Sequence, residues 1–158
     1  MGATAAIAAG SLVGAYMQSE VQRAEGAYTQ RMSRINARRA ELMAEDTIKK
    51  GDQEASNYGN KVKELTGSQK ASLAAQGIDL GFGTAADIIS VTEEQGADNI
   101  KAIKNNAFRE AMGYKTKASD ERIAGDFGKS MSDVKANLTI LSGGLDAVKG
   151  AQKNTGGF

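Results

Sequence analysis

The sequence predicts an all-α fold of long helices, two of which form an antiparallel hairpin with its turn at residues 77–84. The 158 residues contain no proline and 5% aromatic residues, and this composition favours uninterrupted helices over a sandwich or barrel. No segment has the alternating apolar pattern that is typical of a strand. The glycine-rich run GIDLGFG, Gly77 to Gly83, separates two helical patterns and predicts the turn. We expect one helical domain over residues 1–158.

Residues 2–17, GATAAIAAGSLVGAYM, form the first predicted helix and carry no charge. Sixteen helical residues span about 24 Å, less than the ~30 Å hydrocarbon core of a bilayer, so this segment by itself is a poor single-pass anchor. Small residues recur at a spacing of four, a pattern that lets helices pack closely: Gly2, Ala6, Gly10 and Gly14. We expect a seam with neighbouring helices, in lipid or in a protein ring, made by Ala6, Gly10, Leu12, Val13 and Gly14. The alternative is a flexible or simply buried helix.

Residues 18–76 predict one long helix, or two in succession. Its first part has a narrow apolar stripe at steps of three, four or seven: Met17, Val21, Ala24, Tyr28, Met32, Ile35 and Leu42. A basic cluster follows on other faces: Arg31, Arg34, Arg38 and Arg39. These arginines could contact phosphates or lipid headgroups, or form a solvated face with Glu41 and Glu45 as acidic partners.

Glycine, alanine and aliphatic residues repeat every eleven positions on both sides of the predicted turn. The rows are Gly51, Val62 and Leu73 before it, and after it Ala85, Gly96, Ala107 and Ala118 beside Ile89, Ile100 and Ala111. An eleven-residue period is 3.67 residues per turn, so the helices should run nearly straight or supercoil slightly to the right. We expect tight helix packing at Gly51, Ala55, Gly59, Gly96, Ala107 and Ala111, with the first three opposite the last two.

The return helix is predicted over residues 84–118. Thr84 begins it, and Asp87 lies at the spacing of a capping box. We expect the hairpin tip to contact a partner protein; its residues are Gly77, Asp79, Gly81, Gly83 and Thr84. Ser119 is expected to cap a separate amphipathic helix over residues 119–150, followed by a flexible tail over 151–158.

The last predicted helix has a long apolar edge at three-four spacing. Its residues are Ile123, Phe127, Met131, Val134, Leu138, Leu141, Leu145 and Val148, with an interruption near Gly143 and Gly144. Such an edge would be buried against the hairpin, against a neighbouring subunit, or in a membrane interface. The pattern alone leaves these three alternatives open.

Composition argues against catalysis and against a dedicated DNA-binding role. Without cysteine or histidine the chain lacks thiol nucleophiles, the commonest general base and the commonest transition-metal ligand, so we expect no enzyme activity, cofactor or metal. The net charge of +1 and the absence of a long basic block are unlike a DNA-binding protein. Gly81 to Ala86 match a dinucleotide fingerprint, but no strand precedes them. Glu93, Glu94 and Asp98 are expected to form a solvated face rather than a cation site.

One stretch, best over residues 44–125, also carries a family resemblance. The pattern GSQ-A-LAA-GIDL-G-GTA-DI, then Asp98, then IK-NA-REA-GY resembles the smaller internal virion (ejection) proteins of short-tailed bacteriophages. The resemblance is a pattern of glycines, alanines and polar residues, and it weakens after about residue 126. It covers about half of the chain.

The resemblance implies a protein stored inside the capsid near the portal and ejected at infection. It would then assemble with itself, as a homo-oligomeric ring or tube, into a channel across the host outer membrane. The implied partners are the portal, other ejection proteins, the host outer membrane, and double-stranded DNA that passes without sequence recognition. After ejection it would reside in the outer membrane or periplasm. The alternative is a purely structural ring of the virion, the portal-associated core, with no membrane insertion; a further one is a pore-forming protein unrelated to phage.

Overall fold

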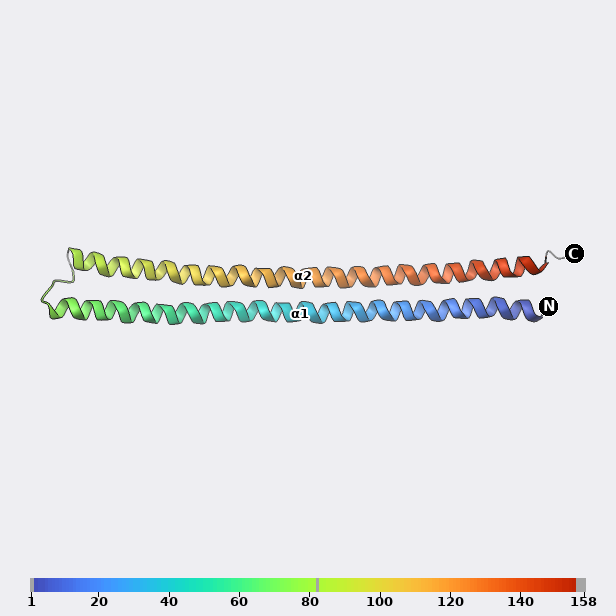
Figure 1. The fold of residues 1–158 in the computed structure, drawn as a ribbon, viewed down its shortest axis with the longest axis horizontal. Helices are drawn as coiled ribbons and strands as arrows, with labels where there is room; N and C mark the ends of the chain where they lie inside the picture. Colours follow the sequence, from blue (N-terminus) through green and yellow to red (C-terminus); the bar gives the residue numbers. More distant parts are fainter. Residues whose placement is uncertain (1, 82, 156–158) are drawn as a thin grey trace. The chain divides into compact units, whose positions relative to one another are not determined.

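The computed structural model contains two long helices that pack against each other as an antiparallel hairpin (Figure 1). Helix α1 spans Gly2–Ala75 and helix α2 spans Thr84–Thr155. The structure describes residues 2–81 and 83–155, without the side chains of residues 2–9, 11, 151 and 153–155, and these ranges contain no strand. The all-α hairpin predicted from the sequence is therefore confirmed.

The chain divides into two compact units, each containing a part of both helices. The turn unit comprises residues 39–117, and the terminal unit comprises residues 1–38 together with 118–158. The two units are described separately below.

Both helices run through the boundaries expected inside them. Residues 2–17 and 18–76 belong to one helix, and so do 84–118 and 119–150. The interpretation of Ser119 as an N-cap is wrong, because this residue lies inside α2 with helical residues on both sides. Serine is tolerated in a helix interior, and without proline nothing in the sequence stops the hydrogen-bond ladder. Helix α2 likewise continues through Gly143 and Gly144, and through residues 151–155 of the predicted tail; residues 156–158 lie outside the described residues.

A Schellman motif ends α1. Gly77 has a φ of 73°, the left-handed conformation that glycine adopts without a Cβ penalty. The amide of Gly77 donates to the carbonyl of Ala74 (3.0 Å), and the amide of Ile78 donates to that of Leu73 (3.1 Å). These two bonds satisfy carbonyls that the helix end would leave unpaired. The glycine at position 77 thus fixes where the chain turns.

The start of α2 lies at Thr84, as predicted, but its cap is different. The amide of Asp87 donates to the carbonyl of Gly83 (3.2 Å), so Gly83, with a φ of 72°, is the N-cap. Thr84 is then the first helical residue, one position too late for a capping box with Asp87. Glycine is accepted at the N-cap, which explains why the helix begins here without a side-chain cap.

Small residues form the contact between the helices within the turn unit. The buried positions are Ala40, Ala44, Gly51, Ala55 and Thr66 on α1, and Ala85, Ile89, Gly96 and Ala111 on α2. Among all described residues, Ile89 is the only large apolar side chain that is buried. The hydroxyl of Thr66 donates to the carbonyl of Lys63 (3.1 Å), which satisfies it inside the contact. We call this line of contact the seam.

The terminal unit has a seam of the same kind. Its buried positions are Ala15, Ser19, Gly26 and Ala37 on α1, and Ala118, Gly125, Ala136, Gly143 and Ala147 on α2. Ser19 donates its hydroxyl to the carbonyl of Tyr16 (2.7 Å). Because none of these side chains is larger than that of serine, the seam of this unit buries little apolar area.

Candidate assembly surfaces

The residues predicted to pack the helices lie on the seam of the turn unit. A Cβ atom placed on Gly51 would collide with the Cβ of Ala107, and one on Gly96 would lie 2.6 Å from Val62 Cγ1. At Gly59 the nearest atom would be Ile100 Cδ1, at 3.4 Å. The structure thus places Gly51 opposite Ala107, but Gly59 opposite Ile100 rather than Ala107 or Ala111. Ala55 and Ala111 are almost fully buried, at 2% and 1% exposure.

Polar pairs at the rim of the seam connect the two helices. In the turn unit, Lys70 pairs with Glu93 (3.2 Å) and Lys104 with Asp52 (3.2 Å). The amide of Asn99 donates to the hydroxyl of Tyr58 (2.8 Å). The charged groups of both ion pairs are exposed, so each ion pair contributes little to stability, about 0–1 kcal/mol.

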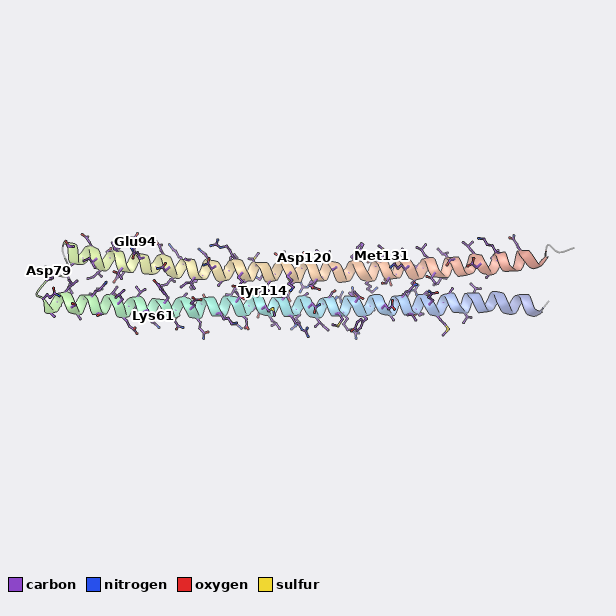
Figure 2. All side chains as sticks on the ribbon, in the orientation of Figure 1. Lys61, Asp79, Glu94, Tyr114, Asp120 and Met131 are labelled. Carbon is purple, nitrogen blue, oxygen red and sulfur yellow. The ribbon has the colours of Figure 1, made fainter. Side chains whose placement is uncertain are left out.

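The predicted hairpin-tip residues are together at the exposed end of the turn unit, where Figure 2 labels Asp79. The carboxylate of Asp79 accepts a hydrogen bond from the amide of Gly81 (2.8 Å), so this side chain is used to shape the turn. Gly77 and Gly83 supply the two positive φ angles. Thr84 is exposed and begins α2.

The predicted N-terminal seam residues do not face α2. Gly10 and Gly14 are exposed, and no atom lies within 4 Å of a Cβ placed on either. Leu12 and Val13 are exposed as well. The side chain of Ala6 lies outside the described residues. The structure therefore leaves Gly10, Leu12, Val13 and Gly14 open to another molecule, whereas Ala15 of the same segment is buried on the seam.

The large apolar side chains of the two rows described here for the terminal unit point away from the seam. In an ordinary helical hairpin such side chains would point toward the other helix and form the core. On α1 the exposed row, here called the α1 outer stripe, is Val13, Met17, Val21, Ala24, Tyr28, Met32 and Ile35. On α2 the α2 outer stripe is Ile123, Phe127, Met131, Val134, Leu138, Leu141, Leu145 and Val148. Figure 2 shows Met131 on the side of α2 that faces away from α1.

Helix geometry explains this outward direction. Tyr28 is two positions from the buried Gly26, and Leu138 is two positions from the buried Ala136. At about 100° per residue, two positions turn a side chain by roughly 200° around the helix. Burial of the α2 stripe against the hairpin, one of three alternatives from the sequence, is therefore wrong, because alanine and glycine occupy that face.

The basic cluster remains at the surface. Arg34 forms an ion pair with Asp126 of α2 (3.6 Å), and Gln30 donates to the same carboxylate (2.7 Å). The acidic partner of Arg34 is thus supplied across the hairpin, which the sequence alone did not indicate. Arg31 and Arg38 are exposed on the same stretch of α1.

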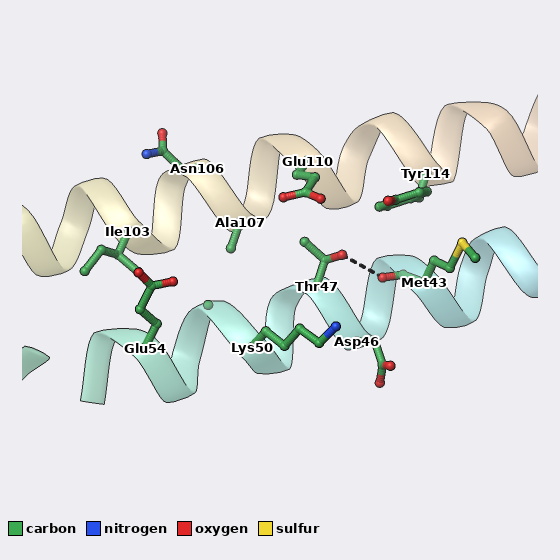
Figure 3. A pocket seen from close by; sticks show the side chains of 11 residues that line it. Met43, Asp46, Thr47, Lys50, Glu54, Ile103, Asn106, Ala107, Glu110 and Tyr114 are labelled. Carbon is green, nitrogen blue, oxygen red and sulfur yellow. Dashed lines mark hydrogen bonds between the residues drawn. The ribbon is translucent and has the colours of Figure 1, made fainter. Parts of the chain in front are cut away.

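A shallow groove of about 620 Å³ lies beside the seam of the turn unit (Figure 3). Gly51 and Ala107, which meet closely across the seam, are part of its lining, and Met43 and Tyr114 lie together at one end. Its lining mixes carboxylates with Lys50 and apolar side chains, and Thr47 donates to the carbonyl of Met43 (2.8 Å). The groove follows from the packing of small residues rather than from a set of converging reactive groups. No sequence signal pointed to it, because its lining comes from both helices.

The described side chains include no group of three acidic or histidine residues that could hold a metal ion. Glu93, one of three carboxylates considered for such a site, pairs with Lys70. No helix in the described part of the chain is long and apolar enough to cross a membrane.

Comparison with known proteins gives no relative: no family model, no curated protein and no solved structure matches the chain.

Proposed function

We propose that the chain is an internal virion protein of a short-tailed bacteriophage. In this role it is stored near the portal, leaves the capsid at infection, and oligomerises into a channel across the host outer membrane for the genome. The proposal combines the resemblance of residues 44–125 with the surfaces of the hairpin. Its partners would be further copies of itself, the portal and the other ejection proteins.

The observation that carries the proposal is the outward direction of both apolar stripes. Phe127, Leu141 and Leu145 are each more than 60% exposed, although an isolated protein would gain about 1.5–3 kcal/mol from burying each one. Long rows of exposed large apolar side chains are typical of a chain that works in contact with another protein or a membrane. A protein that assembles only after it leaves the capsid fits such a surface.

The residues assigned to this role act in assembly rather than in chemistry. Gly10 and Gly14 are free of intramolecular neighbours, which suits close packing against helices of other copies or of the membrane-bound assembly. The exposed tip around Asp79 is the proposed contact with the portal or with another ejection protein. The near-neutral charge of +1 suits a wall along which DNA slides, since phosphate binding grows with the number of neutralised charges.

The test is dye release from vesicles of outer-membrane lipids, with the intact protein and with a variant that lacks residues 2–17. We expect the intact protein to release dye and the shortened one to release little. A Gly10→Leu, Gly14→Leu variant should fall between them, because it keeps the apolar segment but removes its close-packing surface.

If neither protein releases dye and both form the same ring in solution, the membrane role is wrong. The purely structural ring of the virion would then be the better explanation. Dye release that is undiminished by the deletion would instead remove the N-terminal segment from the channel.

A further inference from the structure

The two outer stripes lie at the same level of the terminal unit. Contacts across the seam define this level, because Gly26 lies against Ser132 and Gly125 lies against Ser33. The residue numbers of both pairs (26 with 132, 33 with 125) add up to 158. By this rule the α1 stripe, residues 13–35, is level with residues 123–145, which contain the whole α2 stripe except Val148.

The match extends to single positions. Met17 is level with Leu141, Ala24 with Val134, and Ile35 with Ile123, since each pair also adds up to 158 (17 with 141, 24 with 134, 35 with 123). The pairs Val21 with Leu138, Tyr28 with Met131 and Met32 with Phe127 depart from it by one residue. Antiparallel pairing by itself brings outward positions of the two helices to matching levels, but it does not require both outward rows to be apolar over the same span, as they are here.

We propose that the α1 outer stripe of one copy packs against the α2 outer stripe of the next copy, without a shift along the helix axes. In this arrangement every large side chain of the α1 stripe meets a side chain of the α2 stripe at its own level or one residue from it. The inference rests on the self-assembly within the proposed function and is independent of its membrane step.

When the α1 outer stripe of one copy packs against the α2 outer stripe of the next, a single kind of contact covers both stripes. A two-fold contact between α1 stripes would cover only α1 and leave the eight apolar residues of the α2 stripe in water. A contact between different surfaces repeats from copy to copy, and it closes into a ring when the rotation allows. The structure thus favours a ring or tube whose wall alternates α1 and α2.

The area is sufficient for a stable contact. With about 100 Å² for each half-exposed large side chain, the α1 stripe offers roughly 600 Å² and the α2 stripe roughly 800 Å². One contact would then bury about 1,400 Å² in total, which is within the range of specific protein interfaces.

Charges beside the stripes are complementary in the same arrangement. Glu25 follows Gln22 by three positions, and Lys135 precedes Thr139 by four, so both lie on the face marked by the Gln22–Thr139 hydrogen bond. Glu25 and Lys135 are exposed and nearly level (25 with 135 gives 160). Across the proposed contact, the carboxylate of one copy would therefore approach the ammonium of the next.

Cysteine cross-linking tests this contact directly, because the chain has no cysteine of its own. The full-length Met17→Cys and Leu141→Cys variants are mixed and treated with a bis-maleimide that spans about 8–10 Å, the usual distance between packed helices. We expect covalent dimers in the mixture and only traces with either variant alone. Val21→Cys with Leu138→Cys provides a second level pair, in case one substitution disturbs folding.

The matched control keeps both thiols on the stripes but places them at different positions along the helix axes. Met17→Cys mixed with Ile123→Cys separates them by 18 residues, or about 27 Å, and should give no dimer. Equal cross-linking of the level and off-level pairs would overturn the proposal, and so would cross-linking of Ala24→Cys with itself, which indicates a two-fold α1 contact. Failure of both level pairs while vesicles still release dye would overturn this interface but leave the proposed function standing. If the level pairs cross-link but the protein releases no dye from vesicles, the interface stands and the proposed membrane function is wrong.

Discussion

At the scale of single residues, the size of a side chain decides which helix face meets the other helix. Gly51 allows Ala107 to approach so closely that a methyl group at position 51 has no room. Gly26 and Gly125 make similar contacts with Ser132 and Ser33. A glycine inside a helix destabilises it by up to about 1 kcal/mol relative to alanine, so these glycines persist only where the close approach compensates.

The first prediction follows from this contrast between crowded and open glycines. Gly51→Ala should lower the free energy of unfolding by about 1–3 kcal/mol, since the added methyl forces the helices apart. Gly113→Ala, in the same unit but with open space around it, should raise it by up to about 1 kcal/mol. Urea unfolding followed by circular dichroism measures both. The exchanged pair Gly51→Ala, Ala107→Gly should recover much of the loss, and equal stabilisation by both single substitutions would contradict the close contact.

At the scale of the elements, two left-handed glycines set the ends of the helices around the turn. Gly77 closes the Schellman motif, and Gly83 receives the first hydrogen bond of α2. Between them, Asp79 is bonded to the amide of Gly81. The turn is therefore specified by backbone conformation at Gly77 and Gly83, supported by the Asp79 side chain.

The second prediction concerns the order of substitutions at position 77. Asparagine tolerates the left-handed region better than alanine, and a β-branched residue tolerates it least. Stability should therefore decrease from Gly77 through Gly77→Asn and Gly77→Ala to Gly77→Val, with about 1–2 kcal/mol lost for alanine. Thermal melting gives the order. An alanine variant as stable as the parent would show that the turn does not need this conformation.

The sequence predicted the hairpin well because its signals are local. Gly77 and Gly83 mark the turn, and the eleven-residue rows of Gly51 and Ala107 mark the packed face of residues 44–118. The sequence predicted the terminal unit less well. Ser119 resembles a cap although the helix simply continues, since capping residues are also tolerated in helix interiors.

The periodicity of the sequence did not predict that the outer stripes face away from the seam. Leu138 and Ala136 both belong to rows with helical spacing, and hydrophobicity alone favours the leucine row as the buried one. The structure buries the alanine row instead, because only small side chains let two long helices meet along their whole contact. The continued recurrence of glycine and alanine at Gly125, Ala136 and Ala147 was the available signal.

At the scale of the whole molecule, stability should depend on association. The seams bury mostly alanine, glycine, serine and threonine, whereas most of the large apolar side chains remain in contact with water. Burial of apolar area is the main source of folding free energy. Because an isolated chain buries little apolar area, its free energy of unfolding should be small. Anything that binds the folded form raises its stability by mass action.

The third prediction is a melting temperature that rises with protein concentration. Each tenfold increase should raise it measurably, because copies that cover the outer stripes stabilise the hairpin. Leu138→Ser combined with Leu141→Ser should remove this dependence, since both residues lie on the α2 outer stripe. Leu65→Ser, an exposed leucine of the turn unit, is the matched control and should preserve it. A melting temperature independent of concentration in the parent protein would contradict self-association.

The register of the hairpin also limits how its length can change in evolution. Inserting or deleting residues in one helix rotates every later side chain by about 100° per residue, so most such changes would carry Gly51 or Gly96 off the seam. Eleven residues make three turns and return the same face to the seam, but they move one helix past the other unless the opposite helix changes equally. We therefore expect natural length variants of this hairpin to differ by paired blocks of eleven residues, one block in each helix, with the turn between them unchanged.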